Sequence, residues 1–326
     1  MGLQVRLPVE PVSCFVRFYP LGVIFECIIL NIQFMQWFGG KESDDVEEGS
    51  GGGGFGGRHI ALGGGVLGII GLVFYLLTGV NPTQGVNGGT DPNSQQVNAP
   101  ASGGSEDRQT KFARVIFQGT EDVWDSLFTA AGKHFTHPVL HLYTGEVNAE
   151  GCGFASSATG PFYCPADQKI YLDLSFFQQL RDQFQSPGEM AEAYVIAHEF
   201  GHHIQNLLGV SAKMEAARGR LSDIEYNKLS VKLELQADYY AGVWAHYEAK
   251  YNQNGISIDR SDIDSALVAA HAIGDDRLQQ QSTGRVEPDS FTHGTSAQRA
   301  YWFKKGFDTG DINEGNTFAA GDLPEN

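Results

Sequence analysis

The sequence predicts an α+β domain with a small sheet, preceded by one transmembrane helix. Three observations predict it. Apolar residues recur at helical spacing over long stretches of the C-terminal half. Short runs rich in β-branched and aromatic residues lie before and between them. A separate apolar run without a charged residue covers 60–80 and is long enough to cross a hydrocarbon core of ~30 Å.

Composition divides the chain into four regions. Residues 1–58 are an N-terminal region that ends in a glycine-rich stretch, and 59–81 are the predicted transmembrane helix. A buried helix of a soluble domain is the alternative for the apolar run, but its glycines and low-complexity flanks favour a membrane span. Residues 82–110 are expected to be a flexible linker, because a stretch rich in Asn, Gly, Pro, Ser and Gln is too polar to bury a core. Residues 111–326 suit one compact domain.

In chain order, short apolar runs predict strands and longer periodic stretches predict helices. The predicted strands are Val115–Gln118, Val139–Tyr143 and Lys169–Leu172. The predicted helices are Glu121–Lys133, a helix between Ser186 and Gly209, a helix from about Ser222 to Tyr251, Asp262–Gln281 and Ser296–Thr309. Of the strands, Val139–Tyr143 is either an edge that pairs with an extended substrate or an interior strand.

The helix between Ser186 and Gly209 carries the most informative motif. Ser186, Pro187 and Glu189 read as an N-cap, a first-turn proline and a capping-box glutamate, and Gly209 is placed to end the helix. At 100° per residue, the apolar residues of this helix form one stripe. His198, Glu199 and His202 are expected on the other side of the helix. The alternative, a pair of structural histidines on a core face, fits this pattern poorly.

His198-Glu199-Phe200-Gly201-His202 is an HExxH sequence. Positions i and i+4 lie on one face of a helix, so His198 and His202 can reach one zinc ion while Glu199 lies beside it. By the same arithmetic His203 points away, and we interpret it as structural. The motif therefore predicts a hydrolytic zinc site with Glu199 as general base.

A catalytic zinc site typically takes three protein ligands, so one more is needed. Glu234 is the candidate, and Asp238, one turn later, is the candidate acceptor for the second ring N–H of a liganding histidine. A solvated acidic pair is the alternative, but apolar and aromatic residues nearly surround these two positions. His246 and His271 are weaker alternatives for the third ligand.

At this point the chain resembles a known family. The segments HEFGHH, ELQAD, GCGFASSATGPFYCPADQKIYLDLSFF and SFTHGTSAQRAYWFKKGF look like the bacterial predicted neutral zinc metallopeptidase family, from about Met35 to about Phe318. The wider likeness is to thermolysin-like zincins, where the third ligand is a glutamate within an ExxxD segment on a second helix. The resemblance implies a zincin-like peptidase domain with one Zn²⁺ per chain, Glu234 as ligand, and a peptide or protein substrate.

The oxyanion of a tetrahedral intermediate must also be stabilised. His293, in a glycine-containing turn before the last predicted helix, is the candidate for that role, with a solvated or capping histidine as the alternative. Tyr239 and Tyr240 are further candidates.

The basic residues around the apolar run predict the orientation. Lys41 and Arg58 precede the run, whereas the first basic residue after it is Arg108. The positive-inside rule therefore favours a cytoplasmic N-terminus. We expect a single-pass protein of the bacterial inner membrane with its catalytic domain on the periplasmic or extracytoplasmic side. Cys152 and Cys164 agree, because they are candidates for a disulfide in an oxidising compartment, with two free thiols as the alternative.

Residues 1–34 admit three interpretations. The stretch 21–34 is apolar apart from Glu26 and follows two arginines, which resembles a signal sequence without a cleavage site or a short first membrane span. We favour a third hypothesis, a misplaced start codon, because the family-like sequence begins at Met35. Detection of residues before Met35 at the natural N-terminus by mass spectrometry would reject it.

The net charge of −17 argues against a nucleic-acid partner, which needs a basic surface. The sequence thus predicts a membrane-anchored zinc metallopeptidase, and substitution of the predicted general base Glu199 is its most direct test. The alternatives are a zinc-stabilised membrane scaffold without turnover and a hydrolase of non-peptide amides such as cell-wall cross-links.

Overall fold

The computed structural model describes residues 12–19, 22–29, 35–49, 103–156, 159–184 and 188–319. It divides into two units, Met1–Phe34 and Met35–Asn326. In the first unit, β1 (Val12–Tyr19) and β2 (Gly22–Ile29) pair as an antiparallel hairpin. Residues 22–29 of the apolar stretch that resembled a signal sequence or short span therefore form a β-strand.

The predicted transmembrane helix lies outside the described residues, as does most of the predicted linker. The last part of that linker, 103–110, belongs instead to a helix. Among the residues that the structure describes, no helix combines the length and the apolar character of a membrane span.

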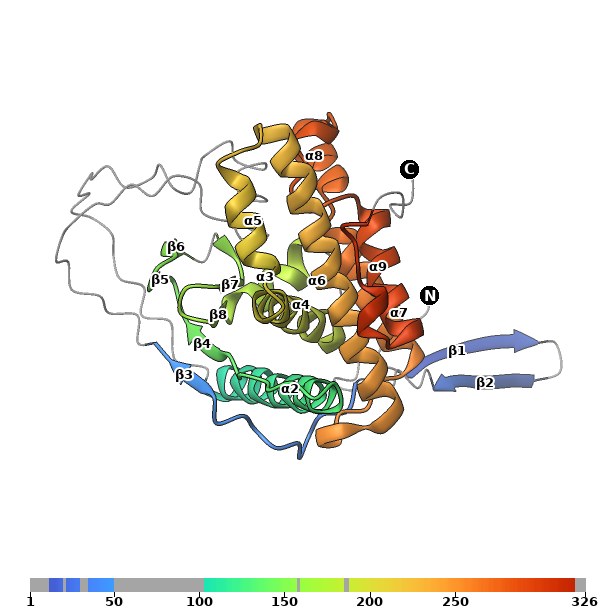
Figure 1. Ribbon diagram of the computed structural model, residues 1–326. Coiled ribbons are helices and arrows are strands. Elements are labelled where there is room, and N and C mark those ends of the chain that lie inside the picture. Colours follow the sequence, from blue (N-terminus) through green and yellow to red (C-terminus); the bar gives the residue numbers. More distant parts are fainter. Residues whose placement is uncertain are drawn as a thin grey trace, which may run out of the picture. The chain divides into compact units, whose positions relative to one another are not determined.

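The second unit contains a four-stranded sheet in the order β3-β4-β8-β7 (Figure 1). Its strands are β3 (Val46–Glu48), β4 (Val139–Tyr143), β7 (Phe162–Cys164) and β8 (Lys169–Asp173). β3, β4 and β8 run parallel, whereas β7 is antiparallel to β8. β4 is therefore an interior strand. A separate hairpin pairs β5 (Glu146–Ala149) with β6 (Gly153–Ser156).

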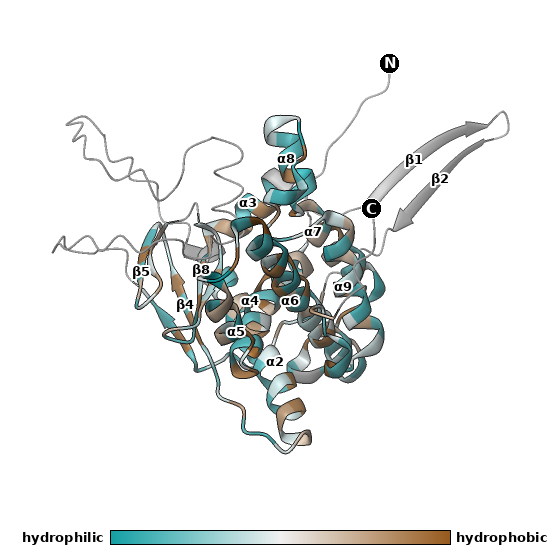
Figure 2. Ribbon diagram, turned by 45° about the horizontal axis from the view of Figure 1, so that its top comes forward, coloured by the Kyte–Doolittle hydropathy of each residue, from teal (hydrophilic) through white to brown (hydrophobic). Residues whose placement is uncertain are grey.

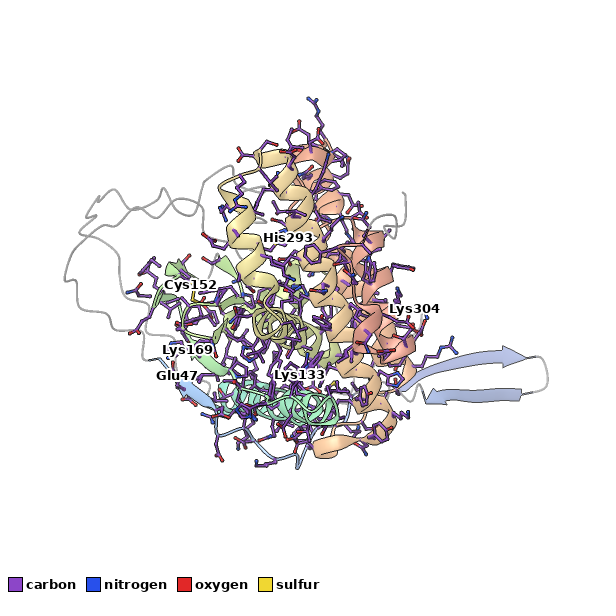
Figure 3. The ribbon with its side chains drawn as sticks, viewed as in Figure 1. Glu47, Lys133, Cys152, Lys169, His293 and Lys304 are labelled. Atoms are coloured by element: carbon purple, nitrogen blue, oxygen red, sulfur yellow. A yellow bond between two sulfur atoms is a disulfide. The ribbon has the colours of Figure 1, made fainter. Side chains whose placement is uncertain are left out.

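Charged side chains tie β3 to the sheet. Glu47 of β3 accepts a hydrogen bond from Lys169 of β8 (Figure 3), and its Oε1 lies 2.6 Å from Nδ1 of His141 on β4. Short edge strands gain little from backbone pairing alone. These contacts across the sheet help to fix a strand of three residues.

The predicted strand Val115–Gln118 is wrong, because these residues lie in the middle of α2 (Gly103–Ala130). The apolar run that suggested a strand is the buried face of this helix, and Phe117 packs edge-on against Phe200 with ring centroids 5.4 Å apart. Tertiary packing overrides the β-propensity of a short run. The predicted helix Glu121–Lys133 is the C-terminal part of α2.

The remaining helices surround α4, which lies near the middle of the second unit (Figure 1). They are α3 (Ser175–Phe184), α4 (Glu189–Leu207), α5 (Val210–Arg218), α6 (Asp223–Tyr251), α7 (Arg260–Ala272), α8 (Asp275–Thr283) and α9 (Ser296–Thr309), with 3₁₀ turns at Gln253–Gly255, Pro288–Ser290 and Ile312–Glu314. Hydrophilic residues cover the outward surfaces of α8 and α9 (Figure 2).

One predicted helix, Asp262–Gln281, is in fact two. α7 ends at Ala272 and α8 begins at Asp275, with Gly274 between them. A Cβ atom at Gly274 would lie 2.2 Å from the backbone nitrogen of Ser296. The chain turns here because only glycine permits so close an approach of the segment that leads into α9.

The predicted one-sided apolar stripe of α4 is also wrong. Residues 190–201 are all buried, including His198, Glu199 and Glu192, so no face of this part of the helix is solvated. A helix that is buried all round lies in the interior of a domain. Ser186 and Pro187 lie outside the described residues, and Gly188 is the N-cap, without a side-chain hydrogen bond.

Glycines bring α4, α6 and α9 unusually close together. A Cβ at Gly201 of α4 would lie 2.9 Å from the carbonyl oxygen of Ala237 on α6. On the other side of α6, a Cβ at Gly242 would lie 2.0 Å from the carbonyl oxygen of Phe303 on α9. Three helices therefore stack with little space between their backbones, and their polar side chains meet in a small volume.

Glu192 gives a test of burial at the start of α4. It pairs with Arg181 of α3 and its side chain is 6% exposed. Burial raises the pKa of Glu192 to about 7, although Arg181 opposes the shift. Because the folded-state pKa lies above the ordinary pKa of a glutamate, folding favours the protonated acid. Stability is therefore expected to fall by about 3 kcal/mol as pH rises from roughly 4.5 to 7.

Glu192→Gln should remove this loss, so denaturant unfolding measured between pH 4 and 8 should show a flatter profile than the wild-type protein. Glu215→Gln, at an exposed position of α5, is the matched control and should follow the wild-type curve. Parallel curves for Glu192→Gln and the wild-type protein would contradict the prediction.

Candidate metal centre

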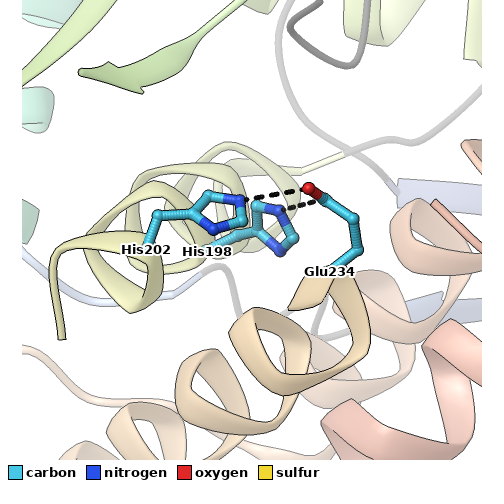
Figure 4. Close-up of side chains that lie close together, drawn as sticks. All are labelled: His198, His202 and Glu234. Carbon is cyan, nitrogen blue, oxygen red and sulfur yellow. Dashed lines mark hydrogen bonds and ion pairs between the residues drawn. The ribbon is translucent and has the colours of Figure 1, made fainter. Parts of the chain in front are cut away.

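Three side chains from two helices converge at the centre of the second unit. His198 and His202 project from one face of α4, and Glu234 projects toward them from α6 (Figure 4). One ligand atom of each lies within 4.8 Å of the others. The i, i+4 spacing places the two histidines one above the other, and the close approach at Gly201 brings the carboxylate of Glu234 within reach.

The distances match the edges of a zinc coordination tetrahedron. The Nε2 atom of His198 lies 3.2 Å from Glu234 Oε2, and the Nε2 atom of His202 lies 3.5 Å from Glu234 Oε1. Tetrahedral ligands at the usual ~2.1 Å from zinc lie about 3.4 Å from one another. Two imidazoles and a carboxylate with a fourth position free are the donor set of catalytic zinc sites, so these residues fit the metal.

The second nitrogen of each histidine ring also has a partner. His198 Nδ1 lies 2.8 Å from Asp238 Oδ1, the contact expected from the sequence. His202 Nδ1 lies 2.8 Å from Gln205 Oε1. Such contacts fix the tautomer and ring orientation, so that each Nε2 lone pair faces the centre. Gln205 was not singled out in the sequence, although it lies three residues after His202 on the same helix.

Sequence reasoning also missed Arg299 and Tyr194. Arg299 of α9 is fully buried and donates from Nε to Asp238 Oδ2 and from Nη2 to Asp238 Oδ1, both at 2.9 Å. Tyr194, one turn before His198, donates its hydroxyl to Asp238 Oδ1 at 2.5 Å. Nothing in the sequence near Arg299 marks it, because its partner lies on another helix. These two residues hold the Asp238 carboxylate, which in turn orients His198.

The pKa values of the two acidic groups in the centre shift in opposite directions. Burial raises the pKa of Glu234, but the neighbouring His202 and His293 bring it well below the usual range. Burial raises the pKa of Glu199, and the charges of His202 and His198 only partly offset this effect. Glu234 is thus suited to act as an anionic ligand, and Glu199 has the raised proton affinity that a general base needs.

His293 lies on the loop before α9 (Figure 3), near enough to Glu234 for their charges to interact. It is 4% exposed, and its Nδ1 lies 3.4 Å from Asp275 Oδ1 and 2.9 Å from the hydroxyl of Thr292. Asp275 Oδ2 accepts the backbone N–H groups of Thr292, His293 and Gly294 at 2.7–3.0 Å. Burial lowers the pKa of His293, and Glu234 and Asp275 raise it above its ordinary value. The loop before α9 is therefore held by the carboxylate of Asp275, which also faces the imidazole of His293.

The other sequence candidates lie elsewhere. His203 bonds to Tyr163 and to the carbonyl of Thr136, as a structural residue would. His246 contacts the carbonyl of Phe307, and His271 is exposed on α7. The Tyr239 hydroxyl donates to the carbonyl of Asp311, and the Tyr240 ring packs edge-on against Trp124.

The structure joins Cys152 and Cys164 in a disulfide. It connects the turn before β6 to β7, beside a small apolar cluster formed by Tyr143, Ala149, Ala155, Phe162, Cys164 and Tyr171. The disulfide thus fastens the hairpin to the sheet that precedes α4.

Comparisons with known proteins show the family of the chain. A family model described as "Putative neutral zinc metallopeptidase" matches residues 35–318. "Uncharacterized protein YpfJ" of Escherichia coli strain K12 is 47% identical over 290 residues, which cover 87% of this chain and 99% of that protein. "Uncharacterized protein Rv2575" of Mycobacterium tuberculosis strain H37Rv is 46% identical over 220 residues, 64% of this chain and 71% of that protein. No solved structure matches. This chain therefore belongs to the neutral zinc metallopeptidase family.

Proposed function

We propose that this protein is a zinc-dependent peptidase that hydrolyses peptide bonds, with His198, His202 and Glu234 holding one zinc ion and Glu199 acting as general base. The observation that carries the proposal is the convergence of these three donors beside a buried glutamate. When bound, zinc supplies a Lewis acid and a water whose pKa falls toward ~7.

Glu199 is the proton carrier. Its raised pKa lets it take a proton from the attacking water and pass it to the leaving amine, as a general base and then a general acid. Asp238 contributes by holding a proton on Nδ1 of His198, which leaves Nε2 free to bind metal.

His293 is the side chain that we assign to an oxygen of the substrate. His293 is held by Asp275 and is expected to donate to the oxyanion of the tetrahedral intermediate. Arg299 Nη1 is buried without a hydrogen-bond partner among the described residues. Buried donors need a partner, so we assign Nη1 to a bound water.

His293→Ala is expected to lower kcat by roughly 10²–10³-fold with zinc retained, the usual cost of removing one oxyanion donor. Steady-state kinetics and zinc content measure this. His246→Ala, which removes a histidine bonded to the carbonyl of Phe307, is the matched control and should keep wild-type kcat. Unchanged kcat in His293→Ala would assign His293 a structural role only.

The sheet edge nearest to α4 is the expected place for an extended substrate. β4 is interior, so the strand-addition role falls to β7, which pairs on one side only among the described strands. Tyr163 of β7 contacts His203 and Asn206 of α4 through its hydroxyl, both at 3.0 Å. A peptide added to this edge would run beside the helix that carries the zinc ligands.

We further propose that the enzyme works outside the cytoplasm, at the inner membrane of a bacterium. The disulfide between Cys152 and Cys164 supports an oxidising compartment. The apolar run 60–80 supports an association with the membrane.

The test is cleavage of a proteome-derived peptide library by the full chain and by its Glu199→Gln variant, with zinc measured in both. We expect one zinc per chain in each, cleavage by the wild-type protein, and a 10²–10⁴-fold lower rate in the variant. Equal rates would overturn the role of Glu199. Zinc without cleavage in either protein would favour the scaffold, or an amide substrate that is not a peptide, and cell-wall fragments would then be assayed.

A further inference from the structure

Residues 35–49, here called the strap, are built into the catalytic domain although they precede the apolar run 60–80 in the sequence. Met35 and Trp37 are each 3% exposed and belong to the main hydrophobic core. The Trp37 ring packs edge-on against Phe112 of α2 with centroids 5.3 Å apart. Its Nε1 donates to Glu189 Oε2, at the first residue of the metal-binding helix, at 2.9 Å.

Polar contacts hold the strap along its length. Gln36 and Ser257 exchange two backbone hydrogen bonds, of 3.1 and 2.8 Å. Ser43 is 1% exposed, and its hydroxyl donates to the buried Glu121 of α2 at 2.8 Å. Beyond it, β3 continues the strap into the sheet beside β4. The strap therefore has the burial and the bonding of an integral part of the domain.

Membrane topology makes this arrangement informative. One crossing of a bilayer by 60–80 places residues before it and residues after it on opposite sides. A second crossing is needed to bring them together, and the sequence 81–102 lacks the run of about 20 apolar residues that a membrane-spanning helix needs. If residues 60–80 cross the membrane once, the strap therefore cannot pack into the catalytic domain.

We propose that the surface formed by α2, β4 and the turn at Gln253–Gly255 is the docking site of the strap, and that strap and catalytic domain lie on the same side of the membrane. The inference rests on the proposed membrane association of 60–80 but not on hydrolysis, since it uses no residue of the metal centre. It replaces the expected single-pass arrangement with one in which the chain approaches the membrane from one side.

A cross-link tests it in the full chain. The residues of an antiparallel pair that exchange both hydrogen bonds have Cα atoms about 5.5 Å apart, within the range of a disulfide. Gln36→Cys/Ser257→Cys should therefore form a disulfide when isolated membranes are treated with an oxidant. A protease site placed in 82–102 makes the disulfide visible on a denaturing gel. After cleavage, the fragment that carries the strap stays joined to the catalytic domain without reductant and separates from it when reductant is added. Each single variant is the control and should release the strap.

A second measurement does not depend on that disulfide. Asp44→Cys in the strap and Lys304→Cys in α9 are exposed positions to be labelled with a membrane-impermeant maleimide in intact spheroplasts, with the unaltered chain measured in parallel. We expect both positions to be labelled, or neither. Labelling of one and protection of the other, with no cross-link in the double variant, would overturn the proposal.

Discussion

His202→Ala is expected to lose stoichiometric zinc and, with it, peptide hydrolysis. The substitution leaves His198 and Glu234 as the only protein donors of the triad, whereas catalytic zinc sites take three. Loss of an outer partner of a zinc ligand costs about 10–100-fold in affinity, and loss of the ligand itself is expected to cost more. Zinc per chain and the Kd from chelator competition measure the effect.

Zinc should also stabilise the fold. At a free zinc concentration of 100 times Kd, binding to the native state alone adds about 2.7 kcal/mol to the free energy of unfolding. The wild-type Tm should therefore fall on chelation and recover on addition of zinc, while His202→Ala should respond to neither. His271→Ala, an exposed histidine of α7, is the control and should bind as the wild-type protein does. Wild-type affinity in His202→Ala would refute this ligand set.

Arg299→Met is expected to lower the free energy of unfolding by about 3–5 kcal/mol, the cost of leaving one partner of a buried ion pair without the other. Arg299 and Asp238 are both fully buried and share two hydrogen bonds. Burial raises the pKa of Asp238, but Arg299 and His198 bring it to about 2. Without the guanidinium, a buried carboxylate is left with His198 and Tyr194 alone. Urea unfolding at neutral pH measures the loss.

The double variant Arg299→Met/Asp238→Asn separates charge from packing. Removal of both charges should recover part of the lost stability, because no unpaired ion remains in the interior. Zinc affinity should stay about 10–100-fold lower than in the wild-type protein, because the carboxylate that orients His198 is missing. Lys304→Met is the surface control: its pair with Asp308 on the same helix is more than half exposed and should contribute little (Figure 3). A fully stable Arg299→Met would refute the role of the ion pair.

The structure agrees with the sequence where the relevant contacts are local. The spacing of His198, Glu199 and His202 is fixed by one helix, and Glu234 and Asp238 by another, so their relative positions follow from helical geometry. The bounds of α6 and α9 lie close to those predicted, because Ser222 and Thr295 form capping boxes that can be read within four residues. The roles of these residues in binding and catalysis stay predictions.

Contacts between distant segments could not be predicted from local spacing in the sequence. Val115–Gln118 looked like a strand because a short apolar run has no clear period, and only packing against Phe200 distinguishes it as a helix. The break at Gly274 depends on the backbone of Ser296, which lies on another element.

The sequence by itself determined the features on which the proposed chemistry rests: an HExxH motif, paired carboxylates four residues apart, and a resemblance to a zinc metallopeptidase family. Tertiary structure alone decided what surrounds that chemistry. Arg299 meets Asp238 across 61 positions of sequence, and the strap meets Ser257 across more than 200. Local spacing is set by the helix itself, whereas these contacts exist only because glycines and apolar side chains let particular helices pack closely.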